Sequence, residues 1–362
     1  MSTFTVPVVR VLLEPHDNAD ALEIARVGDY RSVVRKGQFK AGDLVAYIPE
    51  QALVPDPLLE AMGLRGKLSG KEGNRVKAIK LRGVLSQGLV LEARPGWSEG
   101  QDVAAELGVV KWEPPVPSQM SGLLYGAGTD RCVRYDVENF KAFPEVLVDG
   151  EPVVFTEKIH GTWCQLGLLP AGDAGEHGRL VVTSKGLGAK GLAFAPGAPE
   201  NQTNLYLRVA RHLGIEARID WAFAERVAAA PVFVLGEVFG AGVQDLAYGA
   251  RADQDGALGF RVFDVYVGWV GQGAFLSDAE LEAACAALGL PRVPVLYRGP
   301  FSRAVMRAHT DGRETVSGQA THLREGIVVR PLLERHHPEL GRVQLKSVSE
   351  AYLLRKGGTE YN

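Results

Sequence analysis

The segment Thr156-Glu157-Lys158-Ile159-His160-Gly161-Thr162 decides the fold, and it directly follows the apolar run 152–155. A β-branched and aromatic run that ends in charged residues predicts a strand that delivers its last side chains to a cleft. Lys158 then lies at the strand end, and Gly161 lets the backbone turn closely beneath a ligand. A lysine in this place can act as a nucleophile if its surroundings lower its pKa. Taken alone, however, such a segment is more often a solvated lysine in an ordinary turn.

The composition predicts a two-domain protein, because 362 residues that are 46% hydrophobic can bury substantial cores. A formal net charge of -3 excludes a uniformly basic nucleic-acid coat, so a polyanion must bind to local patches. Cys132, Cys164 and Cys285 form no Cys-x-x-Cys pair and indicate reduced thiols rather than a zinc site. With no signal peptide at Met1–Pro7 and no apolar run long enough for a bilayer, we expect a cytoplasmic protein that does not enter a membrane.

Short apolar runs that alternate with turn sequences predict a β-rich domain at the N-terminus. Five strands at this spacing fit an OB-type barrel, and a small sandwich is the alternative. The segment 15–23 resembles a turn-and-strand sequence of OB-type tRNA-binding domains. The expected strands are Val6–Leu13, Ser32–Val34, Leu44–Ile48, Arg75–Leu81 and Gly88–Leu91.

A dense basic run lies between Arg65 and Arg82 in a chain that is acidic overall. OB barrels often bind nucleic acid on such a face. A solvated strand edge kept soluble by lysines explains the run equally well. The run contains Lys67, Lys71, Arg75, Lys77 and Lys80 against a single acid, Glu72.

A proline-rich segment at 112–118 predicts the domain boundary, because proline cannot easily continue a strand or a helix. We expect an OB-type nucleic-acid-binding domain at 1–111, a linker at 112–130 and a second domain at 131–362. A capping box at Ser277 predicts a helix that runs to Leu288 and ends at Gly289. Other expected elements are helices at 204–213 and 219–229 and strands at 232–235, 326–330 and 342–346.

Five further segments place a charged residue or an aromatic ring in an expected strand or directly before or after one: Lys185, Glu237, Phe263, Glu325 and Lys346. Together with the Lys158 segment, and in this order, they resemble the six collinear motifs of the covalent nucleotidyltransferases, which include ATP-dependent ligases and capping enzymes. The match runs from about residue 150 to residue 350. The Lys-x-His-Gly-Thr form, with His160 where DNA ligases usually have aspartate, resembles the RNA-ligase branch. An OB-like domain before the catalytic domain is similar to the RNA ligase family typified by the Deinococcus radiodurans enzyme.

This resemblance implies an α+β fold, in which an N-terminal OB-type β-barrel precedes an adenylyltransferase (ATP-grasp-like ligase) domain of antiparallel sheets flanked by helices. It implies that ATP and a divalent metal (Mg or Mn) are the cofactors, and that the final lysine contacts the AMP phosphate. It further implies that the catalytic residues are Lys158, Lys185, Glu325 and Lys346. The residues implied to bind the nucleotide are Glu157 at the adenine, Glu237 at the ribose, Phe263 stacked on the base, and Ile159, Gly161 and Lys346. Glu237 and Glu325 are implied to bind the metal ion. His160 is expected to shape the loop.

The chemistry explains these residue types. Formation of a lysyl-adenylate needs a neutral amine facing the α-phosphate of ATP, with pyrophosphate leaving in line. Partial burial and nearby cations such as Lys185 and Lys346 are expected to lower the pKa of Lys158. One departure stands out, because Gln344 occupies the place where many relatives carry a first lysine, and an amide adds no charge. Little sequence follows Lys346, so we expect no C-terminal OB domain.

The expected function is an ATP-dependent RNA ligase that seals 3′-OH and 5′-phosphate ends, with nicks in duplexes containing RNA as the substrate. The expected partner is RNA or an RNA-containing duplex, and we expect a monomer. The alternatives are a DNA ligase, a capping-type nucleotidyltransferase, and a catalytically idle RNA-binding protein. Each residue also has an ordinary structural explanation, such as core packing for Phe263 and solvated strand ends for the carboxylates.

Overall fold

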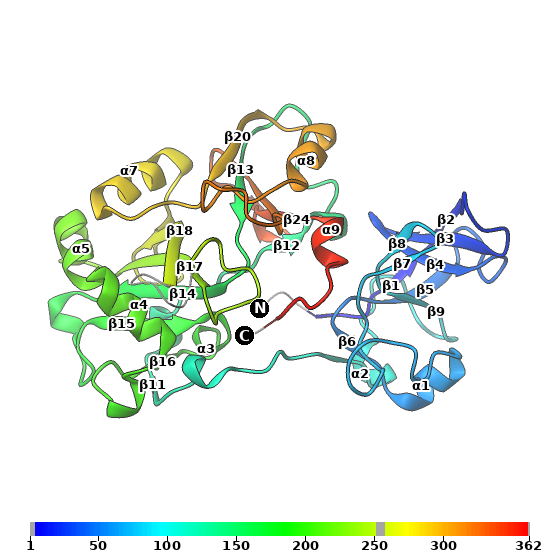
Figure 1. Ribbon diagram of the computed structural model, residues 1–362, viewed down its shortest axis with the longest axis horizontal. Helices are drawn as coiled ribbons and strands as arrows, with labels where there is room; N and C mark the ends of the chain where they lie inside the picture. Colours follow the sequence, from blue (N-terminus) through cyan, green and yellow to red (C-terminus); the bar gives the residue numbers. More distant parts are fainter. Residues whose placement is uncertain (1–3, 251–257, 361–362) are drawn as a thin grey trace. The chain divides into compact units, whose positions relative to one another are not determined.

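The computed structural model describes residues 4–250 and 258–360, which mix helices and antiparallel sheets (Figure 1). The chain forms two compact units by its internal contacts. The N-terminal unit is Ser2–Glu113 with Asn139–Glu145, and the C-terminal unit is Pro114–Glu138 with Val146–Asn362. The predicted α+β class is confirmed. Within the described ranges, no helix is both long enough and apolar enough to cross a membrane.

The N-terminal unit is built from short antiparallel strands, ordered β1-β5-β9 and β2-β3-β4 in its two three-stranded sheets. Alternate residues of β5 enter two cores, since Val45 and Tyr47 face one cluster while Ala46 and Ile48 face another. The elements are β1 (Val8–Arg10), β2 (Leu12–Pro15), β3 (Leu22–Val27), β4 (Tyr30–Arg35), β5 (Leu44–Ile48), β6 (Ala52–Leu53), α1 (Asp56–Ala61), β7 (Ile79–Leu81), β8 (Val84–Ser86), β9 (Leu89–Glu92), α2 (Ala104–Leu107) and β10 (Val110–Lys111).

Two of the strands predicted for this unit are divided or shortened in the structure, and two others, at Ser32–Val34 and Gly88–Leu91, differ from β4 and β9 by one or two residues at their ends. The run Val6–Leu13 is divided into β1 and β2, because Val11 leaves the strand and its N–H donates to Asp43 O at 3.0 Å. The run Arg75–Leu81 forms a strand only from Ile79, because Arg75 instead exchanges backbone hydrogen bonds with Ser69. The strand predicted at Leu44–Ile48 is confirmed.

The C-terminal unit contains two five-stranded antiparallel sheets, which we call the first and the second sheet. The first sheet has the order β12-β24-β21-β13-β20, and the second has the order β15-β14-β17-β18-β19. The strands are β11 (Leu124–Gly126), β12 (Glu138–Asn139), β13 (Pro152–Lys158), β14 (Thr162–Leu168), β15 (Leu180–Ser184), β16 (Leu192–Phe194), β17 (Val232–Gly240), β18 (Leu258–Val267), β19 (Ala274–Phe275), β20 (Val295–Pro300), β21 (Gly326–Pro331), β22 (His336–His337), β23 (Gly341–Arg342) and β24 (Leu345–Val348).

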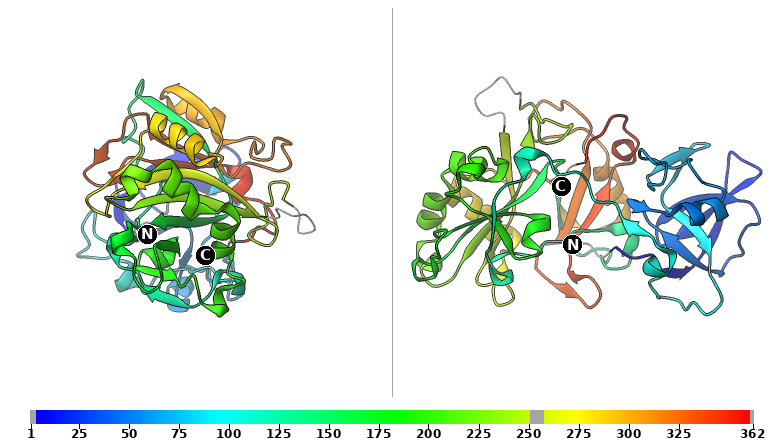
Figure 2. Two further views of the ribbon diagram at one scale, coloured as in Figure 1. Left: turned by 90° about the vertical axis from the view of Figure 1, so that its left-hand side faces the viewer. Right: turned by 90° about the horizontal axis from the view of Figure 1, so that it is seen from below.

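The main core of this unit lies between the second sheet and three helices, α4, α5 and α7, which can be followed in Figures 1 and 2. Cys164, Leu166 and Leu168 of β14 enter this core, while Trp163 faces a second cluster on the opposite side of the sheet. All three cysteines are buried and free. The helices are α3 (Lys185–Gly188), α4 (Leu205–Leu213), α5 (Ile215–Ala222), α6 (Ala224–Val227), α7 (Asp278–Leu288), α8 (Arg303–Thr310) and α9 (Glu350–Leu353).

Two helix predictions are confirmed and one is wrong in its bounds. Asn204 caps α4, and α7 begins with the predicted capping box and ends at Gly289 in the left-handed conformation. The helix predicted at 219–229 begins earlier, at Ile215, and is interrupted at Phe223, whose φ of -129° is not helical. The strand predicted at 342–346 is likewise divided into β23 and β24, because the Val343 N–H donates to Arg335 O at 3.0 Å.

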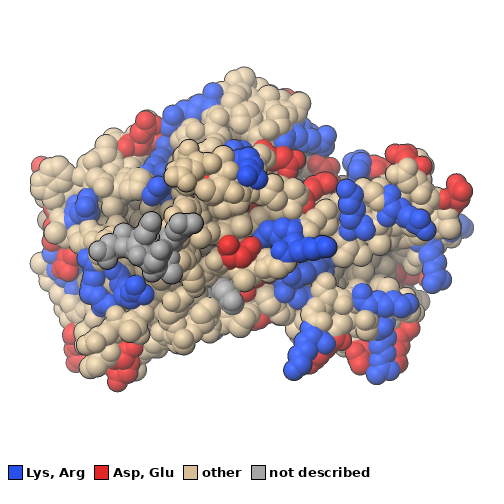
Figure 3. Space-filling model, in the orientation of Figure 1, with Lys and Arg blue, Asp and Glu red and all other residues tan. Residues whose placement is uncertain are grey.

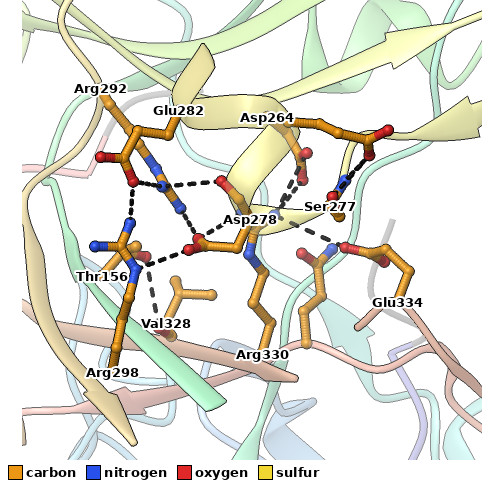
Figure 4. A network of polar contacts seen from close by, with 12 residues as sticks. Thr156, Asp264, Ser277, Asp278, Glu282, Arg292, Arg298, Val328, Arg330 and Glu334 are labelled. Carbon is orange, nitrogen blue, oxygen red and sulfur yellow. Dashed lines mark hydrogen bonds and ion pairs between the residues drawn. The ribbon is translucent and has the colours of Figure 1, made fainter. Parts of the chain in front are cut away.

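A buried network of arginines and carboxylates links the two sheets and α7 (Figure 4). Asp264 of β18 is fully buried, and its Oδ2 lies 3.5 Å from Arg330 of β21 and 2.5 Å from Arg342 of β23. Asp278, the first residue of α7, accepts from Arg298 of β20 at 2.8 Å. Separating the two sheets would leave these buried charges without a partner, which is costly. The network therefore stabilises the arrangement of the two sheets.

Candidate active site

Lys158 is the last residue of β13, the strand that lies between β20 and β21 in the first sheet. It stands opposite Gly326, so the residue that precedes β21, Glu325, lies at the same end of the sheet. Lys158 Nζ donates to Glu325 Oε1 at 2.6 Å. The Lys158 side chain is 28% exposed and that of Glu325 is 9% exposed, so the pair is shielded but the amine remains within reach of a ligand.

The expectation that its surroundings lower the pKa of Lys158 is wrong for this arrangement. Burial does act to lower the pKa, but the carboxylates of Glu325 and Glu237 outweigh it, and the net pKa is raised. The amine is therefore held as an ammonium ion by two carboxyl groups. The cations named for this effect, Lys185 and Lys346, are not among its main influences.

The segment between Lys158 and Thr162 carries the chain from the first sheet to the second, because β13 and β14 belong to different sheets. Gly161 is required where the segment passes β17. A Cβ on Gly161 would stand 2.1 Å from Val238 O and 2.9 Å from Glu237 Cγ. The space beside Gly161 is thus filled by the neighbouring strand rather than left for a ligand.

Glu237 projects from β17 and lies opposite Trp163 in the register of the second sheet. Its Oε1 accepts a hydrogen bond from Gly161 N at 3.2 Å. Burial raises the pKa of Glu237 to about 8; the positive charge of Lys158 opposes this rise, and the negative charge of Glu325 adds to it. Two carboxyl groups from different sheets thus meet around Lys158.

Glu157 and Ile159 flank Lys158 but point away from it into the protein. Glu157 is 1% exposed, and its Oε2 accepts from Thr315 N at 2.9 Å and from Thr315 Oγ1 at 2.5 Å. Its Oε1 is buried and has no hydrogen-bond partner among the described residues. Burial raises the pKa of Glu157 in spite of these bonds. Ile159 packs in an apolar cluster with Phe239 and Tyr248.

Lys346 and Lys185 bring positive charge to the same region from the two sheets. Lys346 lies opposite Val328 in β24, and burial together with Lys158 and Lys185 lowers its pKa to about 8. Lys185 begins α3, directly after β15, and its Nζ lies 3.1 Å from Asp136 Oδ1. Because the charges of Lys158 and Lys185 both act on Lys346, the three lysines lie in one region.

Phe263 of β18 is half-buried and packs beside the Tyr135 ring, with ring centroids 4.8 Å apart. It contacts both the cluster around Tyr135 and the cluster around Ile159. The side chain therefore packs at the edges of two cores, which agrees with the ordinary structural explanation of core packing. Its partial exposure also leaves part of the side chain uncovered.

The Gln344 side chain does not replace the lysine expected at its position. It is 3% exposed, and its Nε2 donates to Asp136 O at 2.9 Å while its Oε1 accepts from Arg342 Nη1 at 3.3 Å. The amide thus supports the segment that carries Asp136, the partner of Lys185. It adds no charge to the region.

Sequence reasoning missed several residues that shape this region. Asp136 and Glu138, the first residue of β12, are two apart, a spacing that puts both on one face of an extended chain and that could have identified them. Asp136 pairs with Lys185, and the negative charge of Glu138 raises the pKa of Lys346 against the burial effect. Thr315 carries no comparable signal, because it reaches Glu157 from a distant loop.

The carboxyl groups of Glu325 and Glu237 suit a divalent metal ion whose other ligands are phosphate oxygens and water. Glu325 Oε2 is buried and has no partner among the described residues, and Glu237 faces the same amine. Among those residues, no group of three or more His, Cys, Asp or Glu side chains could hold a metal ion unaided. Magnesium is commonly bound by one or two carboxylates together with substrate phosphates and water, so two carboxyl groups fit that pattern.

The fold is similar to that of an RNA ligase whose structure has been solved in several states. Naegleria gruberi RNA ligase with AMP and Mn, as a mutant, aligns with a TM-score of 0.77 and 22% identity over 97% of this chain and 98% of that chain. A mutant of the same enzyme with ATP and Mn aligns with a TM-score of 0.75, 22% identity and the same coverage. Its structure with PPi gives a TM-score of 0.77 and 23% identity, again over 97% and 98% of the two chains. A comparison with curated proteins found no match.

Family models match both halves of the sequence. An OB-fold domain model matches residues 5–93, which confirms the OB-type prediction over the small sandwich. The RNA ligase model matches residues 151–348, the stretch that contains all the residues singled out around Lys158 except Asp136 and Glu138. Because this model spans more than half of the sequence, the chain belongs to the RNA ligase family.

Proposed function

We propose that this protein is an ATP-dependent RNA ligase that joins a 3′-OH to a 5′-phosphate through a lysyl-AMP intermediate on Lys158. The observation that carries the proposal is the position of Lys158, at the junction of two sheets, between Glu325 and Glu237 and electrostatically coupled to Lys346. The likeness to solved RNA ligases that contain ATP or AMP supports it.

In the first step, Lys158 Nζ attacks the α-phosphorus of ATP, and a P–N bond forms as the bond to pyrophosphate breaks. The amine must first lose a proton, and Glu325 Oε1 already accepts the hydrogen bond from this ammonium at 2.6 Å. The phosphates of ATP are anionic and are stabilised by positively charged side chains nearby. Lys346 and Lys185 supply that charge, since Lys346 with a pKa of about 8 is mostly protonated at neutral pH.

In the later steps AMP passes to the 5′-phosphate of the RNA, and the 3′-OH then displaces it to seal the strand. Glu237 and Glu325 would hold a divalent metal ion, Mg or Mn, that neutralises phosphate charge when bound. Glu325 Oε2 has no partner among the described residues and is therefore available for this role. Lys346 would contact the AMP phosphate, and Lys185 would support it from the second sheet.

Three residues would hold the nucleotide. The buried Oε1 of Glu157 has no partner among the described residues, so it can accept a hydrogen bond from the amino group of adenine. Phe263 is half-buried and would offer part of its ring to the base. Glu237 would hydrogen-bond a ribose hydroxyl, because a carboxylate oxygen accepts from a hydroxyl group. Ile159 and Gly161 would shape the site through packing.

For the N-terminal unit we propose a role in binding RNA, with domains at 1–111 and 131–362 joined by a linker at 112–130. Part of the basic run is used inside the protein, since Arg75 is 7% exposed and lies 3.2 Å over the Trp112 ring. Arg65 pairs with Asp56 and Glu60. The exposed residues Lys71, Lys77 and Lys80 remain as candidates for phosphate contacts.

Charged side chains of both signs are interspersed over the visible face of the N-terminal unit (Figure 3). Such a surface favours a few local contacts with the nucleic-acid backbone over one continuous basic track. We further propose an RNA-containing duplex as the substrate, a monomeric protein and a cytoplasmic location.

The first test incubates the protein with α-labelled ATP, and in parallel with α-labelled GTP, in the presence of Mg or Mn. We expect label from ATP that stays on the denatured protein and is absent in Lys158→Ala. Absence of a labelled band with either nucleotide would refute the enzyme proposal, and a band from GTP alone would favour a capping-type reaction.

The second test concerns the substrate and the N-terminal unit. Sealing of nicked duplexes with RNA or DNA ends at the break would identify the strand that the enzyme accepts. A protein that begins at Trp112 should keep adenylylation and lose sealing. Undiminished sealing by that protein would contradict the role proposed for the N-terminal unit.

A further inference from the structure

His160, two residues after Lys158, is enclosed by the protein. The residue is 6% exposed, and both of its ring nitrogens have protein partners. Tyr352 OH lies 2.8 Å from Nδ1, and Asp245 Oδ1 lies 2.8 Å from Nε2. A neutral imidazole with its proton on Nε2 satisfies both contacts, because Tyr352 then donates and Asp245 accepts. Burial lowers the pKa of His160, which agrees with the neutral form.

The two partners of His160 come from segments that lie far apart in the sequence. Asp245 follows β17, whereas Tyr352 belongs to α9 near the end of the described chain. Arg355 joins them, because its Nε donates to Asp245 Oδ2 at 3.0 Å and its guanidinium lies 3.7 Å over the Tyr352 ring. Thr359 adds two bonds of 2.8 Å, from its N–H to Asp245 Oδ1 and from Asp245 N to its Oγ1.

The backbone at His160 is held as well as its ring. His160 N donates to Tyr248 OH at 2.6 Å, so the turn is bound on the main chain and on the side chain. On one side of this turn, Lys158 ends β13, and on the other, Gly161 N donates to Glu237. Any displacement of the His160 ring would therefore be transmitted over two residues to the nucleophile.

We propose that Asp245, Tyr352 and Arg355 are positioning residues for Lys158, and that the segment Ser349–Thr359 acts as a clamp on the turn that contains His160. This inference rests on the proposed function, because it concerns the geometry of lysyl-AMP formation. The contacts of the clamp described above are with the His160 ring, with Asp245 and within the clamp itself, and Lys158 Nζ donates to Glu325 instead. The clamp contributes by fixing the turn before the nucleotide binds, so that little reorganisation is needed when Nζ attacks.

The clamp also gives a reason for histidine at a position where DNA ligases carry aspartate. An imidazole offers an acceptor and a donor on opposite sides of one ring, and here they meet Tyr352 and Asp245. An aspartate side chain is shorter and only accepts, so it cannot bridge these two partners. It would also place a second negative charge beside Asp245. In this chain, His160→Asp should therefore impair the enzyme.

The experiment uses the full-length protein and two assays that separate the chemical steps. The first measures the rate of lysyl-AMP formation with α-labelled ATP in a single turnover, over a range of ATP concentrations. The second measures sealing of an RNA whose 5′-phosphate already carries AMP. In that reaction the 3′-OH attacks the 5′-phosphate and AMP leaves, so Lys158 is not needed as a nucleophile.

Tyr352→Phe removes the contact to Nδ1 of the His160 ring, and Asp245→Ala removes the contact to Nε2. We expect each to reduce the maximal rate of lysyl-AMP formation about tenfold, the loss associated with one buried hydrogen bond, with little change in the ATP concentration at half-maximal rate. Sealing of pre-adenylylated RNA should stay within about twofold of wild type, whereas a general folding defect would lower both rates. Tyr297→Phe is the matched control, because its hydroxyl donates to Pro300 O at 2.9 Å outside the clamp.

A rescue experiment addresses the pairing directly. His160→Asp should reduce lysyl-AMP formation by more than tenfold, and the second change Asp245→Asn should restore part of that loss, because it removes the like charge. Additive losses in the double variant would overturn the pairing. Unchanged lysyl-AMP formation in Tyr352→Phe and Asp245→Ala would overturn the clamp alone, whereas a wild-type protein that forms no lysyl-AMP would overturn the proposed function and the clamp with it.

Discussion

Gly161→Ala is the sharpest test of the way the two sheets meet at the nucleophile. The added Cβ would stand 2.1 Å from Val238 O, whereas ordinary contact begins at 3.4 Å. The obstacle is a backbone atom in the middle of the second sheet, so it cannot rotate out of the way. The turn must therefore move by about 1 Å, and a misplacement of this size can reduce a reaction rate by about 10²-fold.

The same displacement would weaken the bond from Gly161 N to Glu237 Oε1, which is already 3.2 Å long. Overpacking of this kind typically costs about 1–3 kcal/mol of stability. We thus expect a folded variant with a moderately lower melting temperature and an adenylylation rate about 10²-fold below wild type.

The assay is single-turnover transfer of label from α-labelled ATP to the protein, with the melting temperature measured on the same preparation. Gly197→Ala is the matched control, because a Cβ there meets nothing within 4 Å and the residue has no left-handed φ. An adenylylation rate for Gly161→Ala within about threefold of wild type would refute the reasoning, since the close approach to β17 would then impose no constraint on Lys158.

Three further predictions concern other residues of the C-terminal unit. Burial and the charges of Lys158 and Lys185 lower the pKa of Lys346 to about 8, so the positive charge of this side chain is lost as pH rises through that value. The KM for ATP should therefore increase several-fold above about pH 8. In Lys346→Arg the KM should stay nearly constant over the same pH range, because arginine keeps its charge. Burial raises the pKa of Glu237 from 4.5 to about 8, so its contribution to stability is complete below about pH 4.5 and lost as pH rises through about 8. Glu237→Gln should lack this alkaline loss, which melting temperatures at about pH 6 and about pH 9 would reveal. Phe155→Ala should lower the free energy of unfolding by about 3–5 kcal/mol in urea titrations, because the ring is fully buried in β13; a loss below about 1 kcal/mol would contradict that burial estimate.

The sequence predicted that Lys158 ends a strand, because an apolar run meets charged residues there. It placed Glu237 and Lys346 at strand ends as well, but the structure has Glu237 inside β17 and Lys346 inside β24. Antiparallel pairing of the strands then brings the three side chains to one region.

What the sequence could not predict depends on contacts across long separations. Thr315 reaches Glu157 across 158 positions, and Tyr352 reaches His160 across 192, without any local pattern that marks either pair. The direction of the pKa change at Lys158 was mispredicted for the same reason. It depends on the balance between burial and two carboxylates, and that balance is set by distances. The interruption of the predicted helix at Phe223 likewise follows from a backbone conformation that propensity does not reveal.

The passage of the chain from β13 to β14 has a mechanical consequence. Only residues 159–161 join the two sheets at this point, and three extended residues span at most about 11 Å. The short connection therefore keeps Lys158, at the end of the first sheet, close to the first residue of β14 in the second sheet. The buried ion pair of Asp264 with Arg330 joins the same two sheets at another place. With two separate attachments, the nucleophile and Glu237 keep their separation although they come from different sheets.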